Sequence, residues 1–146
     1  MTRTLLAAAA VALAVTAVAA QSDPIAARKA LMKANGDQAK VAAAIVKGEA
    51  PFDAAKVQTV FATFADSAAK APALFPDNSK TGGETAALPA IWENKVDFDD
   101  RLAKFGAAAK EAQGKVKNLD SLKATWGGFA KDNCGGCHEK YRAKKS

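Results

Sequence analysis

Apolar residues recur at helical spacing in four separate segments of this chain. The clearest stripe consists of Val57, Val60, Phe61, Phe64 and Ala68, which follow the i, i+3, i+4, i+7 pattern of one helix face. Alanine is frequent and runs of β-branched residues are few, which favours helix further. No segment shows the sustained alternation of apolar and polar residues that is typical of a strand. The sequence therefore predicts an all-α fold.

Capping and breaking residues indicate where each helix begins and ends. Asp23 or Ser22 can cap the first helix, Asp53 the second, and Asn118 or Asp120 the fourth. Four helices are predicted, at residues 24–47, 54–71, 89 to about 114, and about 119–141. Gly48 ends the first, Pro72 ends the second, and Pro89 begins the third. The apolar face of the fourth consists of Leu119, Leu122, Trp126, Phe129, Cys134, Cys137 and Tyr141. Residues 71–88 are rich in turn formers and predict a packed crossover anchored by Leu74 and Phe75. Together these features predict an antiparallel four-helix bundle.

The first twenty residues are expected to be removed from the mature protein. Arg3 precedes an apolar run from Leu5 to Ala20, and small residues occupy the positions that a signal peptidase recognises. A membrane anchor is the alternative, but this run of sixteen residues is shorter than the roughly 20 residues that span a bilayer. We therefore expect residues 1–20 to be a signal peptide and residues 21–146 to be one exported domain that begins at Gln21. No membrane association is expected after cleavage.

The chain has two cysteines, one histidine and two methionines, and this short inventory excludes several kinds of site. A Cys₄ or Cys₂His₂ zinc site cannot be built within one chain, and neither can a disulfide framework or a catalytic scheme that needs two histidines. The net charge of +6 is moderately basic, but lysines and arginines alternate with acids until the last residues. Because there is no basic stripe, we expect no nucleic-acid partner.

Cys134-Gly135-Gly136-Cys137-His138 is a C-x-x-C-H motif, the pattern of c-type haem attachment. On a helix, positions 134, 137 and 138 share one face, so both thiols can form thioethers to one haem while the adjacent imidazole reaches the iron. A thioredoxin-like pair would need a βαβ unit, a zinc site would lack a fourth Cys or His, and a disulfide here would be strained. The motif therefore predicts one covalently bound haem c, with the sole histidine, His138, as proximal ligand.

A four-helix bundle with C-x-x-C-H on its last helix resembles the class II cytochromes c, the cytochrome c′ family. Other stretches of the chain agree with this: Arg28 to Met32, residues 46–53, residues 89–92, and Tyr141-Arg142 after the haem motif. The resemblance covers essentially all of residues 21–146. It implies one haem c, a periplasmic location and, in many members, a homodimer formed through the first two helices.

The resemblance leaves two states open for the sixth ligand of the iron. Typical members are five-coordinate and high-spin, with an apolar residue guarding the open site, whereas a smaller low-spin group binds a methionine sulfur from the first helix. Met32 lies where that methionine is found in relatives, and after cleavage it is the only methionine of the chain. We therefore expect Met32 to bind the iron opposite His138. The alternative is that Met32 only fills the core, a common use of methionine.

Two further contacts with the cofactor are expected. In relatives, the arginine that matches Arg28 meets a haem propionate, as a charge-assisted contact; the alternative is a solvated arginine on a helix surface. Aromatic residues are candidate pocket walls, and Trp92 is the one expected to bind the cofactor; the alternative is that they are ordinary core residues. The candidates are Phe75, Trp92, Trp126 and Tyr141.

The axial ligands decide between two functions. His/Met ligation raises the reduction potential and suits electron transfer, whereas an open site suits binding of nitric oxide or carbon monoxide. We predict a periplasmic electron carrier that is not an enzyme, with a gas-binding protein as the alternative. A peroxidase is disfavoured because no second histidine remains as distal acid–base group. The basic tail of Lys140, Arg142, Lys144 and Lys145 either complements the helix C-terminus or forms a docking patch for an acidic redox partner.

Overall fold

The computed structural model describes residues 23–144, in which helices are joined by turns and loops and the β-structure is one isolated bridge between Ala87 and Arg142. Its α-helices are α1 (Pro24–Lys47), α2 (Ala54–Lys70), α3 (Ala90–Glu93), α4 (Lys95–Lys115), α5 (Leu119–Phe129) and α6 (Gly136–Tyr141). Two 3₁₀ turns, η1 (Ala71–Leu74) and η2 (Asp77–Ser79), follow α2, and a π-helical segment, η3 (Ala130–Gly135), joins α5 to α6. The predicted leader 1–20, the expected mature start Gln21, Ser22 and Lys145 lie outside the described residues.

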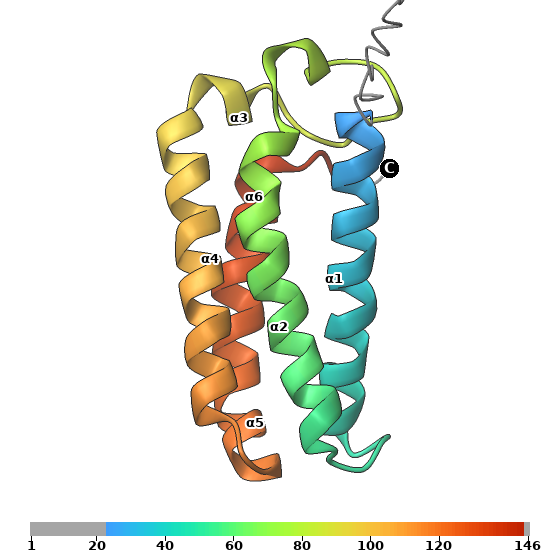
Figure 1. Ribbon diagram of the computed structural model, residues 1–146, viewed down its shortest axis with the longest axis vertical. Coiled ribbons are helices and arrows are strands. Elements are labelled where there is room, and N and C mark those ends of the chain that lie inside the picture. The colour runs from blue at the N-terminus through green and yellow to red at the C-terminus, as the bar shows by residue number, and fades with distance from the viewer. Residues whose placement is uncertain (1–22, 145–146) are drawn as a thin grey trace, which may run out of the picture.

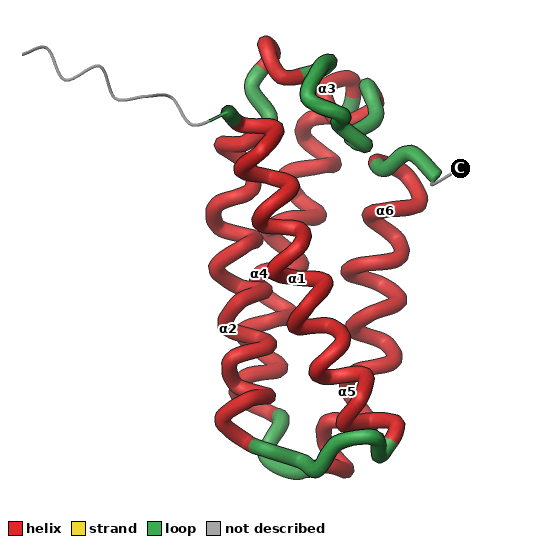
Figure 2. The backbone as a smooth tube through the Cα atoms, turned by 90° about the vertical axis from the view of Figure 1, so that its right-hand side faces the viewer, coloured by secondary structure: helices red, strands yellow, loops and turns green. Residues whose placement is uncertain are grey.

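The long helices stand side by side as four columns: α1, α2, α4, and the column made of α5, η3 and α6 (Figure 1). Consecutive columns run in opposite directions. Short turns at residues 48–53 and 116–118 join them at one end, and the crossover with α3 joins α2 to α4 at the other end (Figure 2). The predicted antiparallel four-helix bundle is therefore confirmed. No helix within residues 23–144 is long and apolar enough to cross a membrane.

The helix ends follow the chemistry of their capping residues. The Asp23 carboxylate accepts a hydrogen bond from the backbone N–H of Ile25, and the Asp53 carboxylate accepts one from the N–H of Lys56. Asn118 caps α5 through a reciprocal capping box with the third residue of that helix. Gly48 ends α1 in the left-handed region, with φ of 79°, which costs glycine little. These predicted caps are confirmed, with Asn118 rather than Asp120 as the cap of α5.

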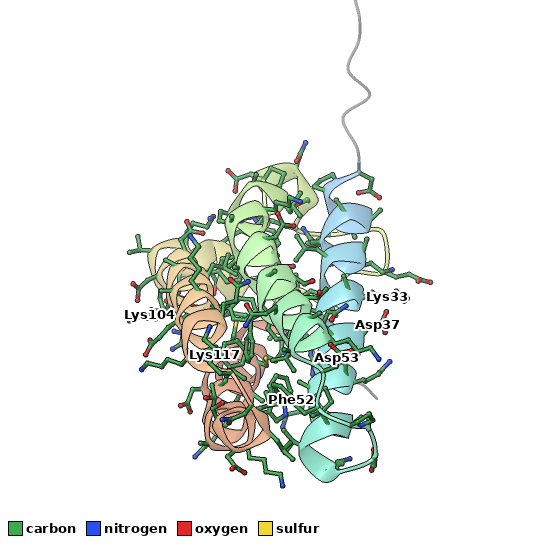
Figure 3. All side chains as sticks on the ribbon, turned by 60° about the horizontal axis from the view of Figure 1, so that its bottom comes forward. Lys33, Asp37, Phe52, Asp53, Lys104 and Lys117 are labelled. Carbon is green, nitrogen blue, oxygen red and sulfur yellow. The ribbon has the colours of Figure 1, made fainter. Side chains whose placement is uncertain are left out.

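The core consists of two apolar clusters stacked along the bundle. The cluster nearer the short turns contains a group of rings around Phe64, whose centroid lies 5.5 Å from that of Phe129 and 5.6 Å from that of Phe105. The cluster beneath the crossover is built on Phe98, which makes edge contacts with Phe75 at 4.7 Å and with Tyr141 at 5.3 Å. Polar side chains such as Lys33 and Asp37 cover the outer side of α1 and point away from the bundle (Figure 3).

Two predicted helices are interrupted. The third does not run unbroken from Pro89: this residue caps the single turn α3, and Asn94 then leaves helical geometry, with φ of −125° and ψ of 46°, before α4 begins. The fourth predicted helix is α-helical only at its two ends, because η3 lies between α5 and α6. Ile91 of α3 and both Asn133 and Cys134 of η3 line an internal cavity, so the two interrupted regions contribute to its wall.

Candidate functional site

The C-x-x-C-H residues form one wall of an internal cavity, at the point where η3 passes into α6. Cys134 lies in the π-helical segment, and Cys137 and His138 follow in the first turn of α6. The backbone N–H of Gly136 bonds to the carbonyl of Lys131, five residues back, which is the mark of a π turn. Both cysteines are free thiols, and both are partly buried like His138. The structure thus brings the three predicted residues to the same cavity.

The cavity has a volume of about 360 Å³ and separates the two core clusters. Its walls come from α1, the crossover, the α3–α4 region and the η3–α6 column. Its lining is mostly apolar, with a few polar side chains, as is usual for a cofactor site. The residues that line it are Arg28, Lys29, Met32, Asn35, Gly36, Ala39, Phe64, Phe75, Thr85, Ala86, Ala87, Ile91, Phe98, Arg101, Leu102, Phe105, Asn133, Cys134, Cys137, His138, Tyr141 and Arg142.

Met32 lines this cavity from α1, a different helix from the one that carries His138. Its side chain is not sealed in the core, because the residue is 37% exposed. The Sδ atom lies 4.0 Å from the Nδ2 atom of Asn35, one helical turn further along α1. The thioether thus belongs to the cavity wall rather than to either core cluster.

Arg28 is buried, with 5% of its surface exposed, and its guanidinium holds the crossover. One terminal nitrogen donates to the carbonyl of Leu74 at 3.1 Å and to the hydroxyl of Ser79 at 2.9 Å. The other donates to the carbonyl of Ser79 at 2.9 Å and to the hydroxyl of Thr85 at 2.7 Å. Burial lowers the pKa of Arg28 below its ordinary value, and Asp23 acts in the opposite direction. A solvated surface arginine is therefore excluded.

The contact between Arg28 and a haem propionate stays a prediction. The structure restricts which N–H groups of Arg28 could make it. Of the five N–H groups of a guanidinium, the four on the terminal nitrogens already face acceptors of the crossover. The Nε–H remains for an anionic group in the cavity that Arg28 lines. The sequence did not predict the hydrogen bonds from Arg28 to the crossover. Ser79 and Thr85 belong to no sequence pattern that indicates a partner on α1.

The aromatic residues divide between the cavity wall and the layers behind it. Phe75 and Tyr141 line the cavity, as expected. Trp92 is not brought to the lining: its indole Nε1 donates to the carbonyl of Phe75 at 3.0 Å, and its ring packs against Phe75. Trp126 belongs to the other core cluster, stacked on Phe64. Trp92 thus supports the wall from behind, and its direct contact with a cofactor stays a prediction.

Burial sets the protonation state of the three motif residues. Desolvation raises the pKa of the Cys134 thiol, with a further rise from Cys137. Desolvation is also the main cause that raises the pKa of Cys137, while Arg101 lowers it. Burial lowers the pKa of His138, and the nearby charge of Arg142 lowers it further. At neutral pH the imidazole is therefore uncharged, the form in which histidine binds a metal.

Asp97 ties α4 to the motif helix α6. Its Oδ2 atom accepts hydrogen bonds from the Tyr141 hydroxyl, from Arg101 Nε at 2.9 Å and from Lys140 Nζ at 2.9 Å. These donors, Tyr141 first, hold the pKa of Asp97 well below its usual range. The spacing of Asp97 and Arg101 on one helix was a visible signal in the sequence. The sequence carried no signal for the two donors from α6, Lys140 and Tyr141, because they lie more than forty residues from Asp97 along the chain.

The donor set fits a covalently held haem. Two thiols and a neutral imidazole stand on one wall, a thioether stands on another, and the remaining lining is largely apolar. Within residues 23–144, no three side chains of His, Cys, Asp or Glu converge on a point that a lone metal ion could occupy. The residues instead face a wide apolar space, as a planar macrocycle requires. A helical bundle with this arrangement on its last column defines a class II c-type cytochrome.

Comparisons with known proteins give the same class. Residues 23–142 match the family described as cytochrome c′. A cytochrome c′ from Rhodopseudomonas palustris is 57% identical over 127 residues, which cover 87% of this chain and 86% of that protein. A cytochrome c-556 from the same species is 39% identical over 149 residues, or 99% of each chain. The solved structure of cytochrome c′ from R. palustris matches with a TM-score of 0.82 at 56% identity, covering 86% of this chain and all of that one.

The chain belongs to the cytochrome c′ family. Its cofactor is one covalently attached haem c, as in the other members of the family. Relatives named cytochrome c′ and relatives named cytochrome c-556 both occur among the similar proteins. The family therefore fixes the class and the cofactor, and the axial ligands of the iron decide between the two functions.

Proposed function

We propose that this protein is a periplasmic electron carrier whose haem is attached through Cys134 and Cys137 and ligated by His138 and Met32. The position of Met32 is the main support. It is the only methionine of residues 21–146, and it lines the cavity that also receives the two thiols and the imidazole. It also belongs to neither core cluster, which supports ligation over a role in core packing.

Each of these residues has a separate role. When bound, the haem supplies a one-electron couple between ferrous and ferric iron. Cys134 and Cys137 fix the macrocycle to the helix, so the site cannot lose its cofactor by dissociation. His138 offers an uncharged imidazole from the same wall. Met32 offers a soft thioether, which favours the reduced state and raises the potential. The proposal assigns no catalytic residue.

The partners and the location are part of the same proposal. The expected leader 1–20 directs export to the periplasm, and N-terminal sequencing of the mature protein should begin at Gln21. The basic end of α6 favours acidic redox proteins as partners. Lys140 is ion-paired with Asp97, so Arg142, which lines the cavity, is the stronger candidate for docking. A homodimer through α1 and α2 is proposed from the family resemblance.

The proposal is tested by replacing Met32 with leucine, which keeps the volume and removes the sulfur. We expect the wild-type protein to be low-spin and six-coordinate, and to bind carbon monoxide slowly because the Fe–S bond must break first. The Met32→Leu variant should be high-spin, should bind carbon monoxide readily, and should have a lower potential. Leu31→Met, which places a thioether outside the cavity lining, is the matched control and should behave like wild type.

The same experiment distinguishes ligation from packing. A swap of methionine for leucine of similar volume costs less than about 1.5 kcal/mol in a core, so packing alone predicts an unchanged spectrum. Met32→Ala would also remove packing volume, at a cost of roughly 2–5 kcal/mol beside the lost ligand bond, so Met32→Leu is the cleaner test. A wild-type protein that is already high-spin, with a spectrum that Met32→Leu leaves unchanged, would remove the support for His/Met ligation.

One observation favours a second function. The relative with 57% identity is named cytochrome c′, whereas the cytochrome c-556 relative is 39% identical. In the second reading the iron is five-coordinate and the protein binds nitric oxide or carbon monoxide. Carbon monoxide would then bind wild type and Met32→Leu at the same rate, an outcome opposite to the one expected above.

A further inference from the structure

Asn35 is the polar residue closest to the Met32 sulfur. It follows Met32 by three residues on α1, so both side chains lie on the same face of that helix. Both line the cavity, and the Asn35 Nδ2 atom lies 4.0 Å from the Met32 Sδ atom. An amide nitrogen is a donor and a thioether sulfur is a weak acceptor, so this contact has the right polarity for a weak hydrogen bond.

Ser67 holds the Asn35 carboxamide. The Ser67 hydroxyl, on α2, donates to Asn35 Oδ1 at 2.7 Å, and Ser67 is only 3% exposed. Because the oxygen of the amide is held by Ser67, its nitrogen must point the other way, toward Met32. A flipped amide would place Oδ1 against the sulfur, where two electron-rich atoms would face each other. A hydroxyl can donate or accept, so Ser67 alone fits either orientation; the sulfur only accepts, so it selects the orientation with Nδ2 toward it, and Ser67 then holds Oδ1.

We propose that Asn35, held by Ser67, is the positioning residue for the Met32 thioether. The proposal rests on the proposed ligation of the iron by Met32. Methionine has three flexible torsions, so a contact is needed to fix the direction of the Met32 sulfur. A donor on one lone pair of the sulfur restricts rotation of the side chain and leaves the second lone pair free to face the cavity. Ser67 on α2 thus holds Asn35, and Asn35 in turn holds the Met32 side chain on α1.

The expected size of the effect follows from the strength of such a contact. A neutral hydrogen bond contributes a net factor of about two to ten to an equilibrium, and a sulfur acceptor belongs at the low end of that range. Removing it should make Met32 easier to displace. We therefore expect carbon monoxide to bind the ferrous protein about two- to fivefold faster when either Ser67 or Asn35 is changed.

The test is a double-mutant cycle with Ser67→Ala, Asn35→Leu and the double variant. If the two residues act through one path, the double variant should bind carbon monoxide no faster than the faster single variant. Thr63→Ala is the matched control, since it removes a hydroxyl from α2 that bonds only to its own helix, at Thr59. This control should match wild type. In the ferrous protein, a nuclear Overhauser effect between the Asn35 side-chain amide and the Met32 methyl should appear, and Ser67→Ala should weaken it.

The outcomes separate this proposal from the proposed function. If Met32→Leu changes the spin state while Ser67→Ala leaves both the carbon monoxide rate and the Overhauser effect at wild-type values, the positioning role is wrong and the ligation stands. If Met32→Leu changes nothing, both are wrong. Additive effects of the two single variants would also overturn the single path. Should Asn35→Leu fail to fold, Ser67→Ala, a small change within a helix, decides alone.

Discussion

Replacing Arg28 by leucine removes the centre of a polar network that holds the crossover against α1. The guanidinium donates four hydrogen bonds to residues of the crossover and lies over two aromatic rings, with centroids at 4.9 and 5.7 Å. Only 5% of the residue is exposed. The variant keeps an apolar side chain at this position but leaves the acceptors of the crossover without their donor.

The loss of stability in Arg28→Leu can be worked out from the hydrogen bonds that each acceptor of the crossover still has in the variant. The Ser79 hydroxyl still donates to the carbonyl of Pro76, and the Thr85 hydroxyl still accepts from the backbone N–H of Ala87. The carbonyls of Leu74 and Ser79 lose the donor. An unsatisfied buried acceptor costs about 1–3 kcal/mol, and water can reach the half-buried Leu74 more easily than Ser79. Adding a lost cation–π contribution of about 0.5–1 kcal/mol, we expect a loss of roughly 3 kcal/mol.

Thermal unfolding and limited proteolysis measure this loss. A destabilisation of about 3 kcal/mol should lower the Tm of a domain of this size by roughly 10 °C. The control is Lys33→Leu, further along α1, whose exposed amine forms a 2.6 Å ion pair with Asp37 on the same helix. Such surface pairs contribute about 0–1 kcal/mol, so this variant should melt close to wild type. Trypsin should cleave after Lys80, inside the crossover, faster in Arg28→Leu than in the control.

The reasoning fails if the two variants melt within a degree or two of each other. It also fails if Arg28→Leu melts lower while cleavage after Lys80 is unchanged, because the loss would then lie elsewhere in the bundle. A variant that cannot be purified is replaced by Thr85→Val, which removes one acceptor and should give a smaller shift in the same direction.

Three further predictions concern other parts of the chain. Haem should stay on the chain in acid–acetone when either Cys134 or Cys137 is replaced by alanine, and should be extracted when both are replaced, because each thiol forms its own thioether. Gly114→Ala should stabilise α4 by about 0.5–1 kcal/mol because nothing lies near the added carbon, whereas Gly106→Ala should gain nothing, because its Cβ would lie 3.0 Å from a side chain of α2. Asp97→Asn should reduce stability at neutral pH, and its deficit against wild type should shrink as the pH falls below about 4.

The sign of the Asp97 effect follows from linkage. Hydrogen bonds from Tyr141, Arg101 and Lys140 lower the pKa of the folded carboxyl below its unfolded value. The stabilisation is therefore fully present above the unfolded pKa, near 4, and is lost as the pH falls toward the folded pKa. Equilibrium unfolding in urea between pH 3 and 7 measures it. A deficit that stays constant over this range would contradict the assignment of this stabilisation to Asp97. Equal stability of the Gly114→Ala and Gly106→Ala variants would contradict the separate prediction for the two glycines of α4.

Local signals in the sequence predicted most of the fold. Caps such as Asp53 and Asn118 act within three or four residues, and the apolar stripe around Phe61 has a period that only a helix satisfies. The break at Asn94 was not predictable, because the residues around it have no breaker beyond Pro89, which helices accept in their first turn. The break is set by the crossover and α6, whose residues pack on α3 from far along the chain.

The candidate site was predictable where one short motif carries the chemistry. Cys134, Cys137 and His138 stand within five residues, so their common wall follows from helical spacing. The supporting contacts were not predictable, since the pair Ser67 and Asn35 is separated by 32 residues. Serine and asparagine occur on many solvated helix faces, and only burial of Ser67 shows that this pair is structural.

The π-helical segment explains how one column can serve both the core and the cavity. Phe129 and Tyr141 are both buried, yet they lie twelve residues apart. At about 100° per residue, a continuous α-helix would place Tyr141 about 120° around the axis from Phe129, on a different face. One extra residue absorbed in η3 reduces that angle to about 20° and returns Tyr141 to the buried face. The π turn therefore allows Phe129 and Tyr141 to be buried on the same side of one column.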